Sequence, residues 1–353
     1  MKAMTVIPGR AGSAAVTEFD GPVGEGDVLV EGVAVGICGT DVEIAEGRYG
    51  TAPAGAERLV LGHESLGRVI DAPAGCGLAT GELVVGIVRR PDPVPCAACA
   101  AGSWDMCLNG RYTERGIVAR HGYGAEQWRV EAGFAVPVPE RLGALAVLVE
   151  PASVVAKAWN HIEQIVARAP VSPRTVLVTG AGPIGLLAAL LGVQRGLDVA
   201  VLDRVLDGPK PGLVADLGAT YHTGSASDLP PADIVVECTG APTVVLDAIR
   251  RTSPAGVTCL TGVSSGGRVI ELDVGAANRR LVLENDVVFG SVNANRSHYE
   301  AATKSLDDAD PAWLARLLTR RIPLDRWTAG FQPRSDDVKV VVELDRAGAS
   351  DQP

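Results

Sequence analysis

The sequence predicts an α/β protein with two domains, one rich in β-strands and one built on a doubly wound parallel sheet. Its 353 residues exceed the usual length of one domain, and 47% are hydrophobic against 21% charged, as in globular proteins with an ample core. Residues 1 to about 155 hold short Val-rich runs interrupted by Gly and Pro, which is typical of all-β domains. Residues from about 172 to 295 alternate between strand-like and helix-like runs, which favours a parallel sheet covered on both faces.

In the first part, strands are expected where aliphatic residues gather between glycines. The opening residues 1–10 indicate a strand, and further Val-rich runs follow at 27–37, 64–72 and 81–88. The opening lacks the long apolar run of a signal peptide, and no run of about eighteen apolar residues occurs, so we expect a cytoplasmic protein that does not span a membrane. The formal charge of −10 is spread along the chain, which argues against a nucleic-acid partner.

In the second part, strands and helices are expected in turn. A strand at 175–180 leads into an Ala- and Leu-rich helix at 183–196, which ends at a glycine, and a strand follows at 198–203. The same reasoning predicts a strand at 233–237, a helix at 242–251, strands at 256–262 and 286–290, and, near the end of the chain, a short helix at 311–321 and a strand at 338–344.

A glycine-rich loop between the strand at 175–180 and the next helix indicates a dinucleotide site. Gly180, Gly182 and Gly185 have the spacing G-x-G-x-x-G in the strand–helix context that makes this motif specific, although a plain turn is the alternative. The first glycine permits the tight turn, the second lets the backbone approach a pyrophosphate, and the third lets helix and strand pack closely. Because the helix N-terminus presents free N–H groups to phosphates, Pro183 and Ile184 are also expected beside the cofactor.

The choice of dinucleotide is expected to depend on Asp203, which ends the next strand, eighteen residues after Gly185. An acidic side chain there binds the adenosine ribose hydroxyls and repels a 2′-phosphate, which favours NAD. Arg204 follows directly and could accommodate a 2′-phosphate, so NADP stays an alternative.

Three of the seven cysteines cluster as Cys96, Cys99 and Cys107. In a reducing compartment, clustered thiols indicate metal ligands more than disulfides.

A second candidate site is the run LVLGHESLGRVI, in which His63 and Glu64 interrupt aliphatic residues. A buried carboxylate is costly unless it is paired, hydrogen-bonded or bound to a metal, so a structural pair at a sheet edge is one explanation. Zinc is the other, because Cys38 upstream and Glu150 downstream would complete a set of competent ligands.

The motifs GICGTD, GHESLGRV, GELVVG and GAGPIGLL follow one another in the order typical of zinc-dependent medium-chain dehydrogenases/reductases, and the chain resembles that family over essentially its whole length. The resemblance implies a GroES-like catalytic domain at residues 1–156 and 296–353 and a Rossmann nucleotide-binding domain at 157–295. It also implies an NAD(P)-linked oxidoreductase that forms a dimer or tetramer, with the strand at 286–290 near the subunit contact.

The same resemblance assigns a catalytic zinc to four residues. Cys38 and His63 match zinc ligands of the family. Glu64 matches a carboxylate that can enter or leave the coordination shell. Glu150 would be the third protein ligand or bind the metal through water.

Thr40 matches the hydroxyl that relays the substrate proton, since a hydroxyl can accept and donate at once. Glu43 stands where many relatives have the outer relay group, often a histidine, so the outer end of the relay departs from the family pattern.

Relatives with a structural zinc carry four cysteines in the lobe that holds it. Cys96, Cys99 and Cys107 match the second, third and fourth of these, whereas the first falls on Pro93, which cannot bind a metal. Asp92 is adjacent and could supply an oxygen ligand. We therefore expect a zinc held by three thiolates and completed by Asp92 or water, with a metal-free lobe as the alternative.

Within the family, segments such as RYTERGI, VEPASVVAKA and FGSVNANRSHYEAA look most like the glucose 1-dehydrogenase branch. This implies oxidation of the C1 hydroxyl of an aldopyranose to the lactone. Glu114 matches a sugar-binding glutamate, Asn293 an asparagine near both sugar and nicotinamide, and His121 is a weaker candidate. Val154 replaces a polar, sugar-contacting residue of some relatives. The alternatives are a dehydrogenase of another polyol, amino alcohol or pathway-specific sugar, and a non-catalytic nucleotide-binding protein on the same fold.

Overall fold

The computed structural model describes residues 1–264, 266 and 269–344, and its contacts divide the chain into two compact units. Unit 1 comprises Met1–Ser153 together with Asn293–Pro353, and unit 2 comprises Val154–Val292. The limits derived from the sequence lie three residues beyond each of these boundaries.

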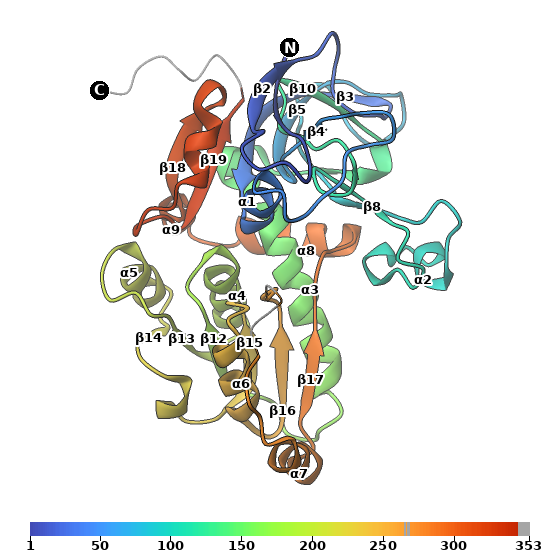
Figure 1. Cartoon of the computed structure of the whole chain (residues 1–353). Helices are drawn as coiled ribbons and strands as arrows, with labels where there is room; N and C mark the ends of the chain where they lie inside the picture. Colours follow the sequence, from blue (N-terminus) through green and yellow to red (C-terminus); the bar gives the residue numbers. More distant parts are fainter. Residues whose placement is uncertain (265, 267–268, 345–353) are drawn as a thin grey trace. The chain divides into compact units, whose positions relative to one another are not determined.

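Unit 1 is built on β-sheets, as its Val-rich runs predict (Figure 1). Its largest sheet runs in the order β11 (Ala135–Pro137), β6 (Leu83–Gly86), β5 (Glu64–Asp71), β3 (Val28–Ile37), β19 (Lys339–Glu343) and β18 (Leu318–Pro323), with β10 (Gln127–Val130) also paired to β3. Two smaller sheets are β2 (Ala15–Glu18), β1 (Lys2–Val6) and β4 (Leu59–Val60), and β7 (Arg89–Arg90), β8 (Thr113–Arg115) and β9 (Ala119–Arg120). Its helices are α1 (Gly39–Ala45), α2 (Ala97–Ala100), α8 (Arg296–Asp307) and α9 (Pro311–Leu317).

The central strand β3 determines where the site of unit 1 lies. It pairs antiparallel with both β5 and β19, and Gly36 stands opposite Glu64 on one side and Val341 on the other. The end of β3 therefore meets the beginnings of β5 and β19 at one corner of the sheet. One core cluster packs beneath this part of unit 1 around Trp327 and Ile44, and a second surrounds Trp128.

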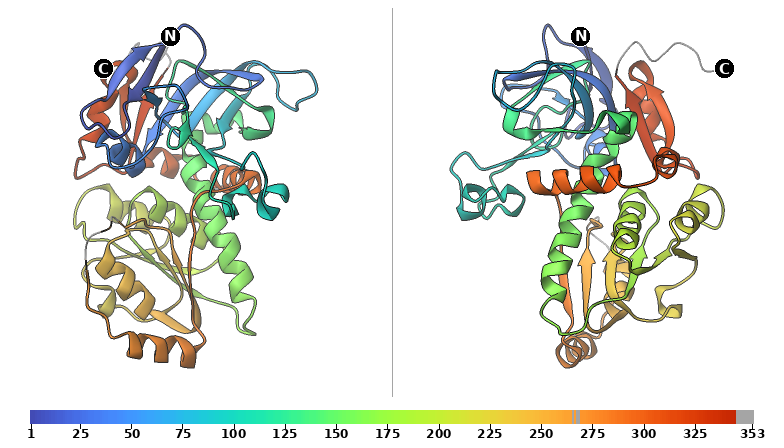
Figure 2. Two further views of the ribbon diagram at one scale, coloured as in Figure 1. Left: turned by 45° about the vertical axis from the view of Figure 1, so that its right-hand side comes forward. Right: turned by 180° about the vertical axis from the view of Figure 1, so that it is seen from behind.

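Unit 2 is a doubly wound parallel sheet, which confirms the predicted fold class. Its strands run in the order β14 (Thr220–His222), β13 (Asp198–Leu202), β12 (Thr175–Thr179), β15 (Ala232–Glu237), β16 (Thr252–Leu260) and β17 (Val287–Gly290), and every neighbouring pair is parallel. Figure 2 (right) shows α3 (Val149–Val166), α4 (Pro183–Gln194) and α5 (Pro209–Asp216) on one face. Figure 1 shows α6 (Pro242–Arg250) on the opposite face, and α7 (Val274–Glu284) precedes β17.

The predicted helix at 311–321 is only half correct. The helix α9 ends at Leu317, and the next residues form β18, which pairs in parallel with β19. Burial along β18 alternates mostly between inward and outward residues, as a strand requires. Pairing with β19 therefore overrides the helical preference of the Leu- and Arg-rich segment.

One helical stretch, Glu140–Val166, is long and apolar enough to cross a bilayer by length and composition alone. Within it, 72% of the most apolar window is buried inside the structure, as in the core helix of a globular protein.

Candidate active site and metal centres

Cys38 and His63 meet at the corner where β3 ends and β5 begins. Cys38 directly follows β3 and is the N-cap of α1, while His63 directly precedes β5. The antiparallel pairing of these strands brings Cys38 Sγ to 3.0 Å from His63 Nε2. Thr40 lies in the first turn of α1, and its backbone N–H donates to the same sulfur at 3.3 Å.

Asp41 completes this group, although no role was predicted for it beyond its place in the motif GICGTD. One carboxylate oxygen accepts from the Cys38 backbone N–H at 3.0 Å, and the other lies 3.4 Å from His63 Nδ1. That second oxygen and His63 Nδ1 are both buried, and neither makes a well-aligned hydrogen bond. Burial opposes a positive charge on His63, but the Cys38 and Asp41 side chains outweigh it and raise the pKa of the imidazole.

Glu64 is paired with a lysine that sequence reasoning missed. Both Glu64 oxygens lie 2.6 Å from Lys339 Nζ, and the ammonium also donates to the Ile37 carbonyl at 3.2 Å. Each residue is 2% exposed. Gly36 leaves room for the carboxylate, because a Cβ there would lie 1.9 Å from Glu64 Oε2. The only hint in the sequence is a lysine at the start of the otherwise apolar segment KVVVEL.

Glu150 reaches the same corner from the start of α3. Ligand atoms of His63, Glu64 and Glu150 lie within 4.8 Å of one another, as do those of Cys38, Asp41 and His63. Burial raises the pKa of Glu150 to about 7, and Glu64 adds to this, while His63 and Lys339 oppose it. Two overlapping groups of donors therefore share His63.

These donors fit a zinc ion. Zn–S and Zn–N bonds are about 2.3 and 2.0 Å long, so one ion can bind both Cys38 and His63 at their observed separation of 3.0 Å. A thiolate, an imidazole and a carboxylate are ligands that catalytic zinc sites use. Zinc bound at His63 Nε2 would leave the ring proton on Nδ1, which lies 3.4 Å from the buried Asp41 oxygen and could donate to it.

The lobe around α2 gathers three thiols but not the predicted fourth ligand. Cys96, Cys99 and Cys107 have their sulfur atoms within 4.8 Å of one another. Asp92 does not belong to this group in the described part of the chain. Its carboxylate instead accepts from Val94 N at 2.8 Å and from two side chains, Asn109 Nδ2 at 2.8 Å and Arg111 Nε at 3.0 Å.

The predicted sugar contacts separate in the structure. Asn293 Nδ2 donates to Glu114 Oε1 at 2.8 Å, so these two residues lie together although far apart in the sequence. His121 does not join them. Its Nδ1 accepts from Val60 N at 3.2 Å and its ring meets Phe19 edge-on, which gives it a packing role.

In unit 2, the three glycines meet the requirements of a dinucleotide loop. Gly180 has φ +92°, and a Cβ on Gly185 would lie 1.7 Å from the Gly180 carbonyl oxygen, so helix and strand pack closely. Gly182 is the N-cap of α4, and a Cβ there would meet nothing within 4 Å. Open space in front of Gly182 leaves room for a pyrophosphate, with Pro183 and Ile184 beginning the helix as predicted.

Asp203 directly follows β13 and holds this loop through a hydrogen bond. Its Oδ2 accepts from Ala181 N at 2.6 Å and lies 3.4 Å from Lys210 Nζ, while Oδ1 accepts from Val205 N at 3.0 Å. Arg204 is exposed. Asp203 therefore has a structural task besides any contact with a ribose.

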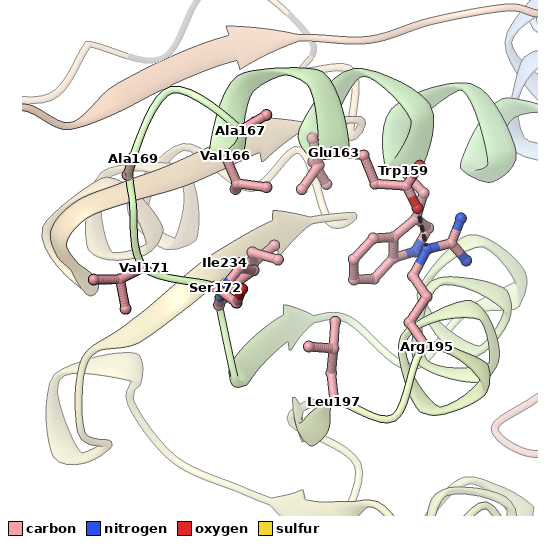
Figure 3. A pocket seen from close by; sticks show the side chains of 12 residues that line it. Trp159, Glu163, Val166, Ala167, Ala169, Val171, Ser172, Arg195, Leu197 and Ile234 are labelled. Atoms are coloured by element: carbon pink, nitrogen blue, oxygen red, sulfur yellow. Dashed lines mark hydrogen bonds and ion pairs between the residues drawn. The ribbon is translucent and has the colours of Figure 1, made fainter.

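A groove of about 310 Å³ lies elsewhere on unit 2 (Figure 3). It is lined by residues of α3 and by residues that lead into the strands, among them Trp159, Ser172 and Leu197. The dinucleotide loop instead follows β12, so the groove lies toward the opposite ends of the strands. None of the site residues predicted from the sequence lines it.

Comparisons with known proteins match both parts of the chain. Residues 24–140 match the family described as alcohol dehydrogenase GroES-like domain, and residues 143–344 match the family described as glucose dehydrogenase C-terminus. Glucose 1-dehydrogenase of Methanocella arvoryzae is 38% identical, with 98% of this chain and 99% of that protein aligned. Glucose 1-dehydrogenase of Thermoproteus tenax is 39% identical over the same shares.

A solved structure is similar over the whole length as well. Glucose dehydrogenase of Haloferax mediterranei, in complex with NADP, zinc and gluconolactone, superposes with a TM-score of 0.89 at 32% identity, covering 98% of this chain and all of that one. An alcohol dehydrogenase of Thermotoga maritima, at 21% identity and a TM-score of 0.81, shares the fold.

Proposed function

The chain belongs to the zinc-dependent medium-chain dehydrogenases/reductases, in their glucose 1-dehydrogenase branch, and we propose that it oxidises the C1 hydroxyl of an aldopyranose such as D-glucose. A hydride passes from C1 to NAD or NADP, the hydroxyl proton is released, and the lactone forms. The observation that supports this most is the pair of ligand groups that share His63, one with Cys38 and Asp41 and one with Glu64 and Glu150, in a chain that aligns throughout with a glucose dehydrogenase holding NADP, zinc and gluconolactone.

The residues of unit 1 divide the chemical work. Cys38 and His63 would hold the zinc, Glu150, which groups with His63 and Glu64, would bind it directly or through water, and Glu64 could enter the coordination shell. Zinc bound there would lower the pKa of a substrate hydroxyl. Thr40, two residues after Cys38, takes the proton, because its hydroxyl can accept one hydrogen bond while donating another. Glu114 and Asn293 hold sugar hydroxyls, which need partners once they leave water.

Unit 2 would bind the oxidant, NAD or NADP. The free N–H groups in the first turn of α4 would bind the pyrophosphate, for which the open space at Gly182 leaves room. We propose that NAD is preferred, because an acidic side chain such as Asp203 directly after the second strand binds the ribose hydroxyls and repels a 2′-phosphate. Lys210 beside Asp203 and exposed Arg204 make NADP the second cofactor rather than an excluded one.

A substrate panel tests the proposal. NADH and NADPH formation is followed with D-glucose, other aldoses, polyols and simple alcohols, before and after treatment with a zinc chelator. We expect glucose or a close epimer to give the highest kcat/KM and chelation to abolish it. A higher kcat/KM for a polyol would favour the alternative dehydrogenase, and no reduction with any alcohol would contradict the proposal.

We also propose that the protein is a homo-oligomer that pairs through β17. This strand ends the parallel sheet, and within the described residues it pairs with β16 alone. The helix that precedes it in the chain, α7, buries none of its residues, and Val274, Val282 and Leu283 are each at least 65% exposed. An open strand edge, together with exposed apolar side chains on the preceding helix, favours a two-fold contact. Light scattering should give twice the chain mass or more, and Val282→Glu with Leu283→Glu should reduce it.

A further inference from the structure

Three donors converge on one oxygen of Glu114. Arg89 Nε lies 3.0 Å and Arg89 Nη2 2.9 Å from Glu114 Oε1, and Asn293 Nδ2 lies 2.8 Å from the same atom. Arg89 is 6% exposed and Glu114 5%. Glu114 Oε2, in contrast, accepts no hydrogen bond from any residue that the structure describes. The carboxylate therefore has one oxygen that can still accept a hydrogen bond.

Arg89 is itself fixed from several sides. It stands directly opposite Glu114 in the antiparallel pair of β7 and β8. Its guanidinium lies over the Tyr112 ring, 3.7 Å from the centroid, and its third nitrogen donates to the Asp105 carbonyl at 3.2 Å. Because its face is stacked and its three nitrogens all donate hydrogen bonds, the guanidinium has little freedom to rotate. The carboxylate that accepts two of these bonds is restricted as well.

Asn293 adds a constraint from a distant part of the chain. It has φ +63°, a left-handed conformation that asparagine tolerates better than most residues. Its Oδ1 accepts from Ala294 N at 2.9 Å, which fixes the amide so that Nδ2 faces Glu114. Arg89 and Asn293 thus approach Oε1 from β7 and from the segment just before α8.

We propose that Arg89 is a positioning residue for the sugar, which acts by holding Glu114 so that Oε2 accepts a hydrogen bond from a substrate hydroxyl. This inference rests on the proposed sugar oxidation. The ion pair also cancels the charges of Arg89 and Glu114, which suits an uncharged polyhydroxy substrate better than an anionic one. Arg89 does not touch the reacting carbon in this account, so its loss should weaken substrate binding more than the chemical step.

The test is a set of Arg89 variants assayed with glucose at saturating NAD(P). We expect Arg89→Met to raise KM about tenfold or more, with kcat changed less than about threefold, because a positioned charged hydrogen bond is lost in ground and transition states alike. Arg89→Lys keeps the charge but not the fork, and should give an intermediate KM. Arg68→Met, which breaks the exposed Arg68–Glu140 pair of the same unit, is the matched control and should leave KM unchanged.

A double-mutant cycle separates positioning from direct contact. If Arg89 acts through Glu114, the Arg89→Met change should have little further effect on KM in a Glu114→Gln background. An equal effect in both backgrounds, or an unchanged KM in Arg89→Met, overturns the inference. Should Arg89→Met fail to fold, Arg89→Lys carries the test, and a KM equal to that of the wild type then overturns it. A wild-type enzyme that oxidises no sugar would instead contradict the proposed function.

Discussion

Lys339 and Glu64 form a buried ion pair whose stability depends on both partners. Each is 2% exposed, and Lys339 Nζ lies 2.6 Å from both Glu64 oxygens. Removing one partner of such a pair leaves an uncompensated charge and costs about 3–5 kcal/mol, whereas replacing both is far milder.

We therefore expect Lys339→Met to lower the free energy of unfolding by about 3 kcal/mol and Lys339→Met with Glu64→Gln to recover most of the loss, measured by urea unfolding of the zinc-free protein. Lys304→Met, which breaks an exposed pair with Asp308, is the control and should change little. A double variant no more stable than Lys339→Met would contradict this account of the pair.

Glu131 gives unit 1 a pH-dependent stability. It lies 2.8 Å from Arg90 Nη2 and 2.7 Å from Arg120 Nη1. Burial alone would raise the pKa of Glu131, but Arg90 and Arg115 outweigh it and hold the pKa at about 2. Because this lies below the ordinary value of 4.5, the stabilisation is fully present above about pH 4.5 and is lost as the pH falls toward 2.

Glu131→Gln should accordingly be less stable than the wild type by about 1–2 kcal/mol at pH 7, a figure reduced for its partial exposure. The difference should shrink steadily between pH 4.5 and pH 3, as urea unfolding at each pH would show. Glu140→Gln, at an exposed carboxylate, should give a small difference throughout. If the difference in free energy of unfolding between Glu131→Gln and the wild type stays constant down to pH 3, Glu131 acts by packing alone.

At the scale of elements, the α2 lobe is expected to hold a metal without help from Asp92. The three thiols are grouped, whereas the Asp92 carboxylate is engaged by Asn109 and Arg111. We expect metal analysis to find two zinc ions per chain in the wild type and in Asp92→Asn, and one in Cys99→Ser. One zinc ion per chain in the wild type would show that the lobe binds none, and loss of zinc in Asp92→Asn would restore the ligand role predicted from the sequence.

The sequence was most informative where one local pattern decides the structure. The Gly180–Gly185 loop, its flanking strand and helix, and the Val-rich β3 could be predicted because turn chemistry and side-chain periodicity act over a few residues. The helix α7 escaped prediction, since it buries none of its residues and shows no apolar stripe facing a core.

Partners brought together by sheet pairing could not be predicted in the same way. Lys339 meets Glu64 because β19 and β5 both flank β3, and Arg89 meets Glu114 because β7 pairs with β8. Apart from the lysine at the start of the apolar segment KVVVEL, neither contact leaves a local signal. The same cause explains β18, where pairing with β19 decides the conformation of a segment whose composition favours a helix.

At the scale of the whole molecule, the residues of the proposed zinc site and those of the proposed nucleotide site belong to different units. The proposed zinc ligands Cys38, His63 and Glu150 all belong to unit 1, whereas Gly182 and Asp203 of the proposed nucleotide site belong to unit 2, and each unit has its own sheets. A variant of one site should therefore lose zinc, and a variant of the other should lose affinity for the dinucleotide. A single shared site or a general folding defect would instead affect both properties together.

Two reciprocal variants make this testable. Cys38→Ser should lose the catalytic zinc, and its kcat/KM should fall at least about a hundredfold, because the Lewis acid contributes several kcal/mol. Its Kd for NADH should stay within about twofold of the wild type.

The fold should tolerate Gly182→Val, since Gly182 has φ −80° and a Cβ there meets nothing within 4 Å. The added side chain would fill the space that the pyrophosphate needs. Gly182→Val should thus raise the Kd for NADH, measured by nucleotide fluorescence, and keep its full zinc content. A Cys38→Ser protein that binds NADH as poorly as Gly182→Val, or a Gly182→Val protein depleted of zinc, would mean that the two sites depend on each other and that the division between the units is not functional.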